Sequence, residues 1–344
     1  KDHPFASVTK GLSEVRSGGT VYVARGDYSE RVTVTRSVDL LGGYLETDWS
    51  RDIGAHTTTL DARGTGTVVV INGPGSRVTV EGFSITGGEA SWHGLGGGLM
   101  IDEARAVTIR YNTIRGNHAA CAGAGLFTNE GIQTVIEANR IYDNVAEGTF
   151  VPLVKPGLQS PQQGPLPGGG VWVGAPARVV NNLIYNNRSG AGGDGVALSA
   201  FGGTIQFWHN TVVDNGGTNS VGVQALGSGS ELYNNLIVGH GTGISGTAQA
   251  TWDYNGFYDN GARYAPALSA GGHDVGGDPR FVDRAGHDYH LRAGSAMTGR
   301  GTDLGVNVDL DGAPRPAPAG TEPDLGAYEF SAQRVYLPLV MRQQ

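Results

Sequence analysis

The chain has 344 residues, a formal net charge of −8 and only three lysines, Lys1, Lys10 and Lys155, so it lacks the basic surface that neutralises nucleic-acid phosphates. The same acidic balance repels polyanionic polysaccharides and favours a neutral glycan or a protein as partner. No stretch approaches the roughly 20 apolar residues of a membrane span, so we expect none.

The start of the chain predicts a short helix. Val8, Leu12 and Val15 recur at helical spacing. Because the end strand of a β-tube is unpaired, a helix at this position suits a lid over that end. We therefore assign residues 1–18 to an N-terminal helical cap.

The middle of the chain repeats one spacing of Asn residues. An Asn, an apolar residue two positions later and a second Asn five positions later recur in five copies, and a sixth copy has His in the last position. The copies are Asn112/Ile114/Asn117, Asn139/Ile141/Asn144, Asn182/Ile184/Asn187, Asn210/Val212/Asn215, Asn235/Ile237/His240 and Asn255/Phe257/Asn260. Their first Asn residues lie 27, 43, 28, 25 and 20 positions apart. The longest spacing contains a Pro-rich segment, which indicates a loop insertion at residues 148–168.

This repeat predicts an all-β solenoid. Asn tolerates the left-handed backbone of sharp turns, and its amide can bond to the coil above or below. We therefore expect Asn ladders in a right-handed parallel β-helix over residues 19–271, with His240 in an Asn position of a ladder rather than in a catalytic role. The single Cys121 excludes internal disulfides and Cys-based zinc sites, and we expect a buried thiol.

A second repeated frame, a Gly followed by an apolar residue, predicts the first strand of each coil and begins at Gly98, Gly125, Gly170, Gly195, Gly222 and Gly243. Side chains alternate between the two faces of a strand, so the first apolar residue of this frame should point inward and the next residue outward. The predicted inward column is Leu99, Leu126, Val171, Val196, Val223 and Ile244. The predicted outward column is Met100, Phe127, Trp172, Ala197, Gln224 and Ser245.

Met100, Phe127 and Trp172 form an apolar line on the predicted outer face, and soluble proteins seldom leave such a line bare. The line predicts a binding surface for sugar, a surface for a partner, or a floor covered by the chain's own loop at Phe150 to Pro167. The pattern leaves all three interpretations open.

Acidic residues lie beside this line. The frame places Asp102 next to Asn129 and Glu103 next to Glu130 on adjacent coils. Close carboxylates either share a proton or hold a hard cation, and oxygen ligands suit Ca²⁺, so these four residues are the metal candidates. Glu103, Glu130 and Asp194 are the catalytic candidates, against the alternative that they face water at a turn.

The end of the chain has a different composition. Beyond Gly272 the Asn repeat stops, and we assign residues 272–330 to a C-terminal capping domain. The tail, residues 331–344, contains an apolar, strand-like run made of Val335, Tyr336, Leu337, Pro338, Leu339, Val340 and Met341. An apolar strand in water needs a partner. We expect it either to pack on its own molecule or to add to a neighbouring molecule as an assembly segment.

Motifs at both ends resemble those of a known group of secreted bacterial proteins. The N-terminal motifs are Pro4-Phe5-Ala6-Ser7-Val8, Gly19 to Tyr28 and Leu41-Gly42-Gly43-Tyr44, and the C-terminal motifs are Asp278 to Asp283, Asp288-Tyr289-His290-Leu291, Asp309 to Arg315 and Asp324 to Glu329. They are similar to those of the pectate-lyase-like right-handed parallel β-helix superfamily with a C-terminal choice-of-anchor Q domain. The resemblance implies the fold and export, and we interpret a chain that begins at Lys1 as the mature form of a secreted, extracellular or cell-surface protein.

That superfamily contains lyases, glycosidases, adhesins and proteins without known activity, so the resemblance selects no chemistry. Its lyases use a Lys or Arg base beside acidic residues that hold calcium, whereas the coils here contain no lysine outside the inserted loop. The leading hypothesis is a non-catalytic structural, self-assembling or adhesive β-helix subunit. The alternative is a polysaccharide lyase or glycoside hydrolase that acts on a cell-wall or extracellular glycan.

Overall fold

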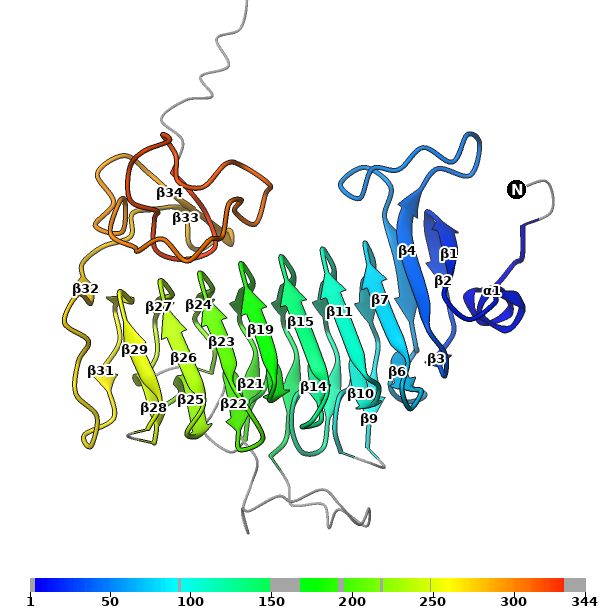
Figure 1. Cartoon of the computed structure of the whole chain (residues 1–344), viewed down its shortest axis with the longest axis horizontal. Coiled ribbons are helices and arrows are strands. Elements are labelled where there is room, and N and C mark those ends of the chain that lie inside the picture. Colours follow the sequence, from blue (N-terminus) through cyan, green and yellow to red (C-terminus); the bar gives the residue numbers. More distant parts are fainter. Residues whose placement is uncertain are drawn as a thin grey trace, which may run out of the picture.

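The structure, a computed structural model, describes residues 4–91, 94–148, 168–190, 195–216, 219–247 and 249–330. Over these residues the chain winds into a right-handed tube of parallel strands, with one helix at the N-terminal end and a small irregular unit on one side (Figure 1). The right-handed parallel β-helix predicted from the Asn repeat is confirmed.

The coils contribute strands to three long sheets. Sheet A contains β1 (Gly19–Ala24), β4 (Val38–Tyr44), β7 (Arg77–Glu81), β11 (Ala106–Arg110), β15 (Gln133–Glu137), β19 (Ala177–Val180), β23 (Ile205–Trp208), β26 (Ser230–Tyr233) and β29 (Thr251–Asp253). Sheet B contains β2 (Gly26–Tyr28), β5 (Thr58–Asp61), β8 (Ser84–Thr86), β12 (Thr113–Arg115), β16 (Arg140–Tyr142), β20 (Leu183–Tyr185), β24 (Thr211–Val213), β27 (Leu236–Val238), β30 (Gly256–Tyr258) and β32 (Val275–Gly276). Sheet C contains β3 (Val32–Val34), β6 (Val69–Asn72), β10 (Leu99–Glu103), β14 (Leu126–Thr128), β18 (Val171–Gly174), β22 (Val196–Ala200), β25 (Val221–Gly227), β28 (Thr242–Gly246) and β31 (Ala262–Tyr264). A short sheet D contains β9 (Glu89–Ala90), β13 (His118–Ala119), β17 (Val145–Ala146) and β21 (Arg188–Ser189).

The inside of the tube is a continuous apolar core. On sheet C the predicted inward residues pair in register from coil to coil and are fully buried: Leu99, Leu126, Val171, Val196, Val223 and Ile244. Each coil thus stacks its aliphatic side chains on those of the next coil, one strand spacing of about 4.8 Å away.

A short helix packs against the first coil, as predicted. Helix α1 (Val8–Glu14) begins at Ser7, whose side chain accepts a hydrogen bond from the Lys10 amide. The Glu30 carboxylate accepts two more N–H groups of the first turn, from Val8 at 2.7 Å and Thr9 at 2.9 Å. Val8 and Leu12 are buried in the tube core, so the helix partly covers its N-terminal end.

Two buried ladders run along the corners of the tube, as the repeat predicted. The Asn139 Oδ1 accepts hydrogen bonds from the Asn112 amide N–H at 3.0 Å and from its Nδ2 at 3.1 Å. The Asn139 Nδ2 donates to the Ile109 carbonyl at 2.8 Å and to Asn182 Oδ1 at 3.0 Å. Since each ladder side chain satisfies polar groups of neighbouring coils, the ladders fix the register of the stack.

The left-handed residues of these corners are not the ladder Asn residues. They directly precede the first Asn of each copy and have φ between 53° and 57° at Tyr111, Ala138, Asn181, Asn234 and Tyr254, and 52° at His209. Our assignment of the left-handed conformation to the ladder Asn is therefore wrong. The physical reason is that the ladder residue must keep its amide inside the corner, so the residue before it makes the sharp turn.

His240 takes an Asn position in the second ladder. Its Nε2 accepts a hydrogen bond from the Asn215 amide at 3.3 Å, and its own amide donates to Asn260 Oδ1 at 2.9 Å. Burial lowers the pKa of His240 to about 4. A ladder role for His240 accounts for its position without catalysis.

We expect the His240→Asn variant to resist acid better than the parent chain. The unfolded state binds a proton at His240 near pH 6.5, whereas the folded state does so only near pH 4, so the parent loses stability as the pH falls through this window. A shift of this size corresponds to at most about 3 kcal/mol in the free energy of unfolding at pH 4. Denaturant unfolding at pH 7 and pH 4 measures it, with exposed His287→Asn as the control. An equal acid-induced loss in His240→Asn and the parent would contradict the assignment.

The C-terminal end of the tube is closed by the segment that follows β31. Tyr264 packs on Phe257 and Trp252, with ring centroids 5.1 and 5.6 Å apart, and its hydroxyl donates to Asp274. We expected residues 272–330 to cap this end. Instead, residues 278–330, here called the C-terminal unit, lie beside the tube over sheet B (Figure 1).

The sequence of sheet B explains this position. Its outward residues are polar in the early coils, at Thr59, Ser84 and Thr113, whereas the later coils place the apolar Leu183 and Leu236 on either side of Thr211. The later coils bury this apolar surface against Tyr289, Leu291, Met297, Leu310, Leu325, Ala327 and Tyr328 of the C-terminal unit, which contains the antiparallel pair β33 (Phe281–Asp283) and β34 (Asp288–Leu291). The unit therefore docks through the hydrophobic effect where the tube offers apolar surface.

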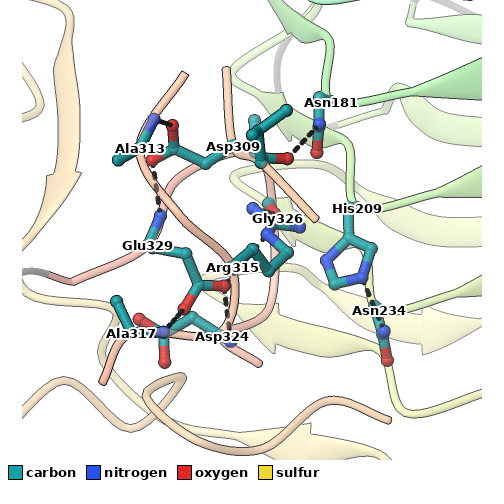
Figure 2. Close-up of polar contacts among 12 residues, drawn as sticks. Asn181, His209, Asn234, Asp309, Ala313, Arg315, Ala317, Asp324, Gly326 and Glu329 are labelled. Carbon is teal, nitrogen blue, oxygen red and sulfur yellow. Dashed lines mark hydrogen bonds and ion pairs between the residues drawn. The ribbon is translucent and has the colours of Figure 1, made fainter. Parts of the chain in front are cut away.

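Three buried carboxylates hold the irregular backbone of the C-terminal unit (Figure 2). Asp309 accepts hydrogen bonds from the backbone N–H groups of Ala313 at 2.8 Å and Glu329 at 3.0 Å. Glu329 accepts from Ala317 at 3.1 Å and from Asp324 at 2.9 Å. These contacts replace the strand pairing that a loop-rich segment lacks.

Arg315 lies among these carboxylates and is equally buried. Its Nε lies 3.0 Å from Glu329 Oε1, and its Nη2 donates to the Gly326 carbonyl at 3.0 Å. Burial raises the pKa of Glu329 to about 7 and also raises that of Asp324, and in both cases the positive charge of Arg315 acts in the opposite direction. Arg315 therefore balances buried negative charge at the centre of the unit.

Candidate functional site

The outer face of sheet C brings the predicted apolar line together. Met100 pairs with Phe127, Phe127 with Trp172 and Trp172 with Ala197, in the register expected from the sequence. These side chains lie outside the tube, and Phe127 belongs to a separate small cluster. Phe127 is only 4% exposed, whereas Trp172 is partly exposed.

The cover over Phe127 comes from the turns that precede the strands of sheet C. Leu95, Cys121 and Ala122 pack on the Phe127 ring. These turns fold back tightly because Gly123 has φ of +58°, and a Cβ there would lie 3.0 Å from the Cβ of Phe127. The buried thiol expected at Cys121 is confirmed.

The loop from Phe150 to Pro167 lies outside the described residues, so our interpretation of the apolar line as a floor under this loop stays a prediction. Within them, the turns at Leu95 and Cys121 cover Phe127. Trp172 stacks on Phe127, with ring centroids 6.1 Å apart and 17° between the planes. Trp172 thus extends the buried cluster to the protein surface.

A second column of outward positions lies two residues further along each strand. Asp102, Asn129, Gly174 and Ser199 occupy it, since residues i and i+2 of a strand share one face. Asn129 Nδ2 donates to the Asp102 carbonyl at 3.0 Å and to Asp102 Oδ1 at 2.9 Å. Asp102 and Asn129 are neighbours, as the frame predicted.

Glu130 bridges this polar column. Its Oε1 accepts a hydrogen bond of 2.6 Å from Ser199 on β22, two strands away from β14 in the order of sheet C. Between them lies Gly174 of β18, where a Cβ would come within 2.6 Å of the Glu130 backbone nitrogen. The missing side chain therefore lets the chain at Glu130 pass close to β18, and the carboxylate remains at the surface.

The other chemical candidates do not converge here. Within the described ranges, no three His, Cys, Asp or Glu side chains form a group that could hold a metal ion, so calcium at Asp102, Glu103, Asn129 and Glu130 stays a prediction. Asp194 lies outside the described residues. Glu103 pairs in register with Asn72 of the preceding coil.

Arginine can serve as the base in the related lyases, but two arginines of the coils, Arg110 and Arg140, have acidic partners away from sheet C. Arg110 donates to Glu81 at 2.6 Å on sheet A, and Arg140 of sheet B donates to Asp311 of the C-terminal unit at 2.7 Å. Neither faces the carboxylates beside Trp172. In these positions both arginines act as structural ion-pair partners.

Phe201 is a surface residue that the sequence frame missed. It follows β22 and is 52% exposed. It continues the outward alternation of Ala197 and Ser199, so counting by two beyond the strand would have found it.

Comparisons with known proteins agree with the fold. A family model described as "Protein of unknown function (DUF1565)" matches residues 1–206. A search of curated protein sequences finds no match. The crystal structure of pectate lyase Pel9A is similar, with a TM-score of 0.55 and 12% identity over 94% of this chain and 91% of that chain. At this identity the likeness shows the shared parallel β-helix alone.

The comparisons do not test two of the expectations from the sequence. The resemblance of the C-terminal motifs to a choice-of-anchor Q domain stays a prediction, and so does secretion. The part of the chain that the structure describes contains no helix that is long and apolar enough to cross a membrane.

Proposed function

The chain belongs to the DUF1565 family, whose description assigns no activity, and we propose from its structure that it is an extracellular β-helix that binds a neutral glycan. The binding face is the outer side of sheet C around Trp172. This makes the molecule an adhesive or carbohydrate-binding subunit rather than an enzyme.

The observation that supports the proposal is the position of Trp172. Its ring stacks on buried Phe127 and yet stays partly exposed, so the ring is held in place before a ligand arrives. An aromatic ring offers its face to the apolar side of a sugar. The carboxylates of Asp102 and Glu130 can accept hydrogen bonds from sugar hydroxyls.

The charge of this face favours a neutral ligand. Asp102 and Glu130 contribute carboxylates to the outer side of sheet C, and the whole chain carries a net charge of −8. A polyuronate would be repelled by these groups unless a cation intervened. A neutral polysaccharide avoids this cost.

We expect Trp172→Leu to lower the affinity for neutral glycans about tenfold or more, because truncation of a central aromatic contact removes much of the binding energy. Leucine preserves apolar cover over Phe127. Affinity electrophoresis in gels containing galactan, xylan, mannan or β-glucan measures retention, with Trp208→Leu on sheet A as the matched control. Equal retention of both variants and the parent would refute the assignment of the binding face.

The same samples test the enzymatic alternative. A lyase acting near Glu103, Glu130 and Asp194 would release unsaturated products that absorb ultraviolet light, and a hydrolase would release reducing ends. Robust product formation that is lost in Glu130→Gln would replace the binding proposal with the alternative.

Assembly through the tail remains a separate proposal. The run from Val335 to Met341 lies outside the described residues, so its support is its apolar, strand-like sequence. Truncation after Ser331 followed by light scattering tests it. A parent chain that remains monomeric at high concentration would contradict assembly.

A further inference from the structure

An exposed aromatic residue, Phe201, lies two residues after Ser199, which donates a hydrogen bond to the Glu130 carboxylate. Phe201 follows the last residue of β22 and is 52% exposed, which is unusual for a large apolar side chain beside a well-packed sheet. Its strand begins next to Trp172, since Ala197 pairs with Trp172. Phe201 and Trp172 therefore lie on the same outer side of sheet C, with the buried residues Ala197 and Ser199 of β22 between them.

The space next to Phe201 is open because glycines follow it. Gly202 and Gly203 are both exposed. A Cβ on Gly202 would lie 3.6 Å from Glu130 Oε2, the oxygen that does not receive the Ser199 hydroxyl. Glu130 is exposed and its Oε2 lies near Gly202, the residue after Phe201, so this oxygen can accept a hydrogen bond from a ligand.

The register sets the separation of the two rings. Gly174 pairs with Ser199, so the path from Trp172 to Phe201 runs two residues along β18, across one coil and two residues further. This corresponds to about 13 Å along the strands and about 4.8 Å along the tube. A ligand that touches both rings must be longer than one sugar ring.

We propose that Trp172, Glu130 and Phe201 form one site for a neutral oligosaccharide that lies across the strands of sheet C. Sugar rings stack on Trp172 and on Phe201, and Glu130 Oε2 accepts hydrogen bonds from hydroxyls of the sugar between them. Ser199 holds the carboxylate in place through Oε1. This inference rests on the proposed glycan binding and adds its ligand class and its specificity residue.

Glu130 gives the site its discrimination against acidic sugars. A uronic acid placed between the two rings would bring its carboxylate against Glu130, and the net charge of −8 on the chain adds to the repulsion. A neutral sugar offers hydroxyl donors at the same place. The neutral oligosaccharide should therefore bind more tightly than the uronate of the same linkage.

Binding of matched oligosaccharides tests this site. Calorimetric titration compares galacto-oligosaccharides with oligogalacturonates, and manno-oligosaccharides with oligomannuronates, at low ionic strength and without divalent cations. We expect Phe201→Ala to weaken the neutral ligand about tenfold. Tyr111→Ala is the control, because Tyr111 is an exposed aromatic residue that follows β11 of sheet A.

Glu130→Gln keeps an oxygen for the Ser199 hydroxyl and removes the charge. We expect it to lower the preference for the neutral over the acidic oligosaccharide at least fivefold, whereas exposed Glu322→Gln should leave the preference unchanged. If Trp172→Leu weakens binding but Phe201→Ala and Glu130→Gln match their controls, the three-residue site is wrong and the glycan-binding function stands. If the parent chain binds none of the neutral ligands, both proposals fail.

Discussion

Replacing Arg315 with methionine is expected to release the C-terminal unit from sheet B and to destabilise the C-terminal unit by about 3–5 kcal/mol. Methionine preserves much of the buried volume but leaves the carboxylates of Glu329, Asp324 and Asp309 without their positive partner. The pKa values of Glu329 and Asp324 should then rise, because burial already raises them against the influence of Arg315.

Hydrogen exchange followed by mass spectrometry measures this release region by region. Amides of residues 278–330 should exchange much faster in Arg315→Met, and the uncovered outer face of sheet B should bind a hydrophobic dye. Exposed Arg300→Met provides a matched control in the same unit. Unchanged exchange over residues 278–330 in Arg315→Met would show that the buried charge balance does not hold the unit.

Replacing Asn182 with alanine is expected to destabilise the tube itself by about 3–5 kcal/mol. Asn182 is fully buried, and its Oδ1 accepts from the Asn139 amide and from Asn139 Nδ2, both at 3.0 Å. Its Nδ2 donates to the Ile136 carbonyl at 2.9 Å and to Asn210 Oδ1 at 3.0 Å. Alanine leaves these groups without partners in a place that water cannot reach.

Chemical denaturation at neutral pH measures the loss as a lower transition midpoint, with exposed Asn72→Ala as the control. Asn182 lies in the middle of its ladder, so its loss should weaken coils on both sides. If Asn182→Ala and Asn72→Ala had the same midpoint as the parent, the ladder would contribute nothing to the register or stability of the stack.

The sequence predicted the features that repeat. The spacing between Asn139 and Asn182 differs from the others, but the same side-chain pairing connects them because both residues occupy the same corner of adjacent coils. The alternation within each strand likewise placed Met100, Phe127 and Trp172 in one outward column. Periodic contacts are predictable because one local rule generates each of them.

The sequence analysis missed features that do not repeat from coil to coil. The cover over Phe127 depends on how far the turn at Cys121 folds back, and spacing contains no information about that. The position of the C-terminal unit did have a signal. Leu183-Ile184-Tyr185 and Leu236-Ile237-Val238 are continuous apolar runs, which indicate strands buried on both faces.

Phe201 was missed for a related reason. It lies just past the end of β22, where the repeated frame stops, and its importance depends on Glu130 from another coil. The site combines residues from β18, the end of β22 and the turn after β14. Only the stacking of the coils brings these segments together, so a one-dimensional pattern cannot reveal their common surface.

The most direct test of glycan binding on sheet C is to follow the indole N–H signals of the five tryptophans by nuclear magnetic resonance during titration with a neutral oligosaccharide. The Trp172→Leu variant identifies the Trp172 signal. The account predicts that this signal shifts in a saturable manner while those of Trp49, Trp208 and Trp252 stay in place. A saturable shift of another tryptophan, with the Trp172 signal unmoved, would contradict it.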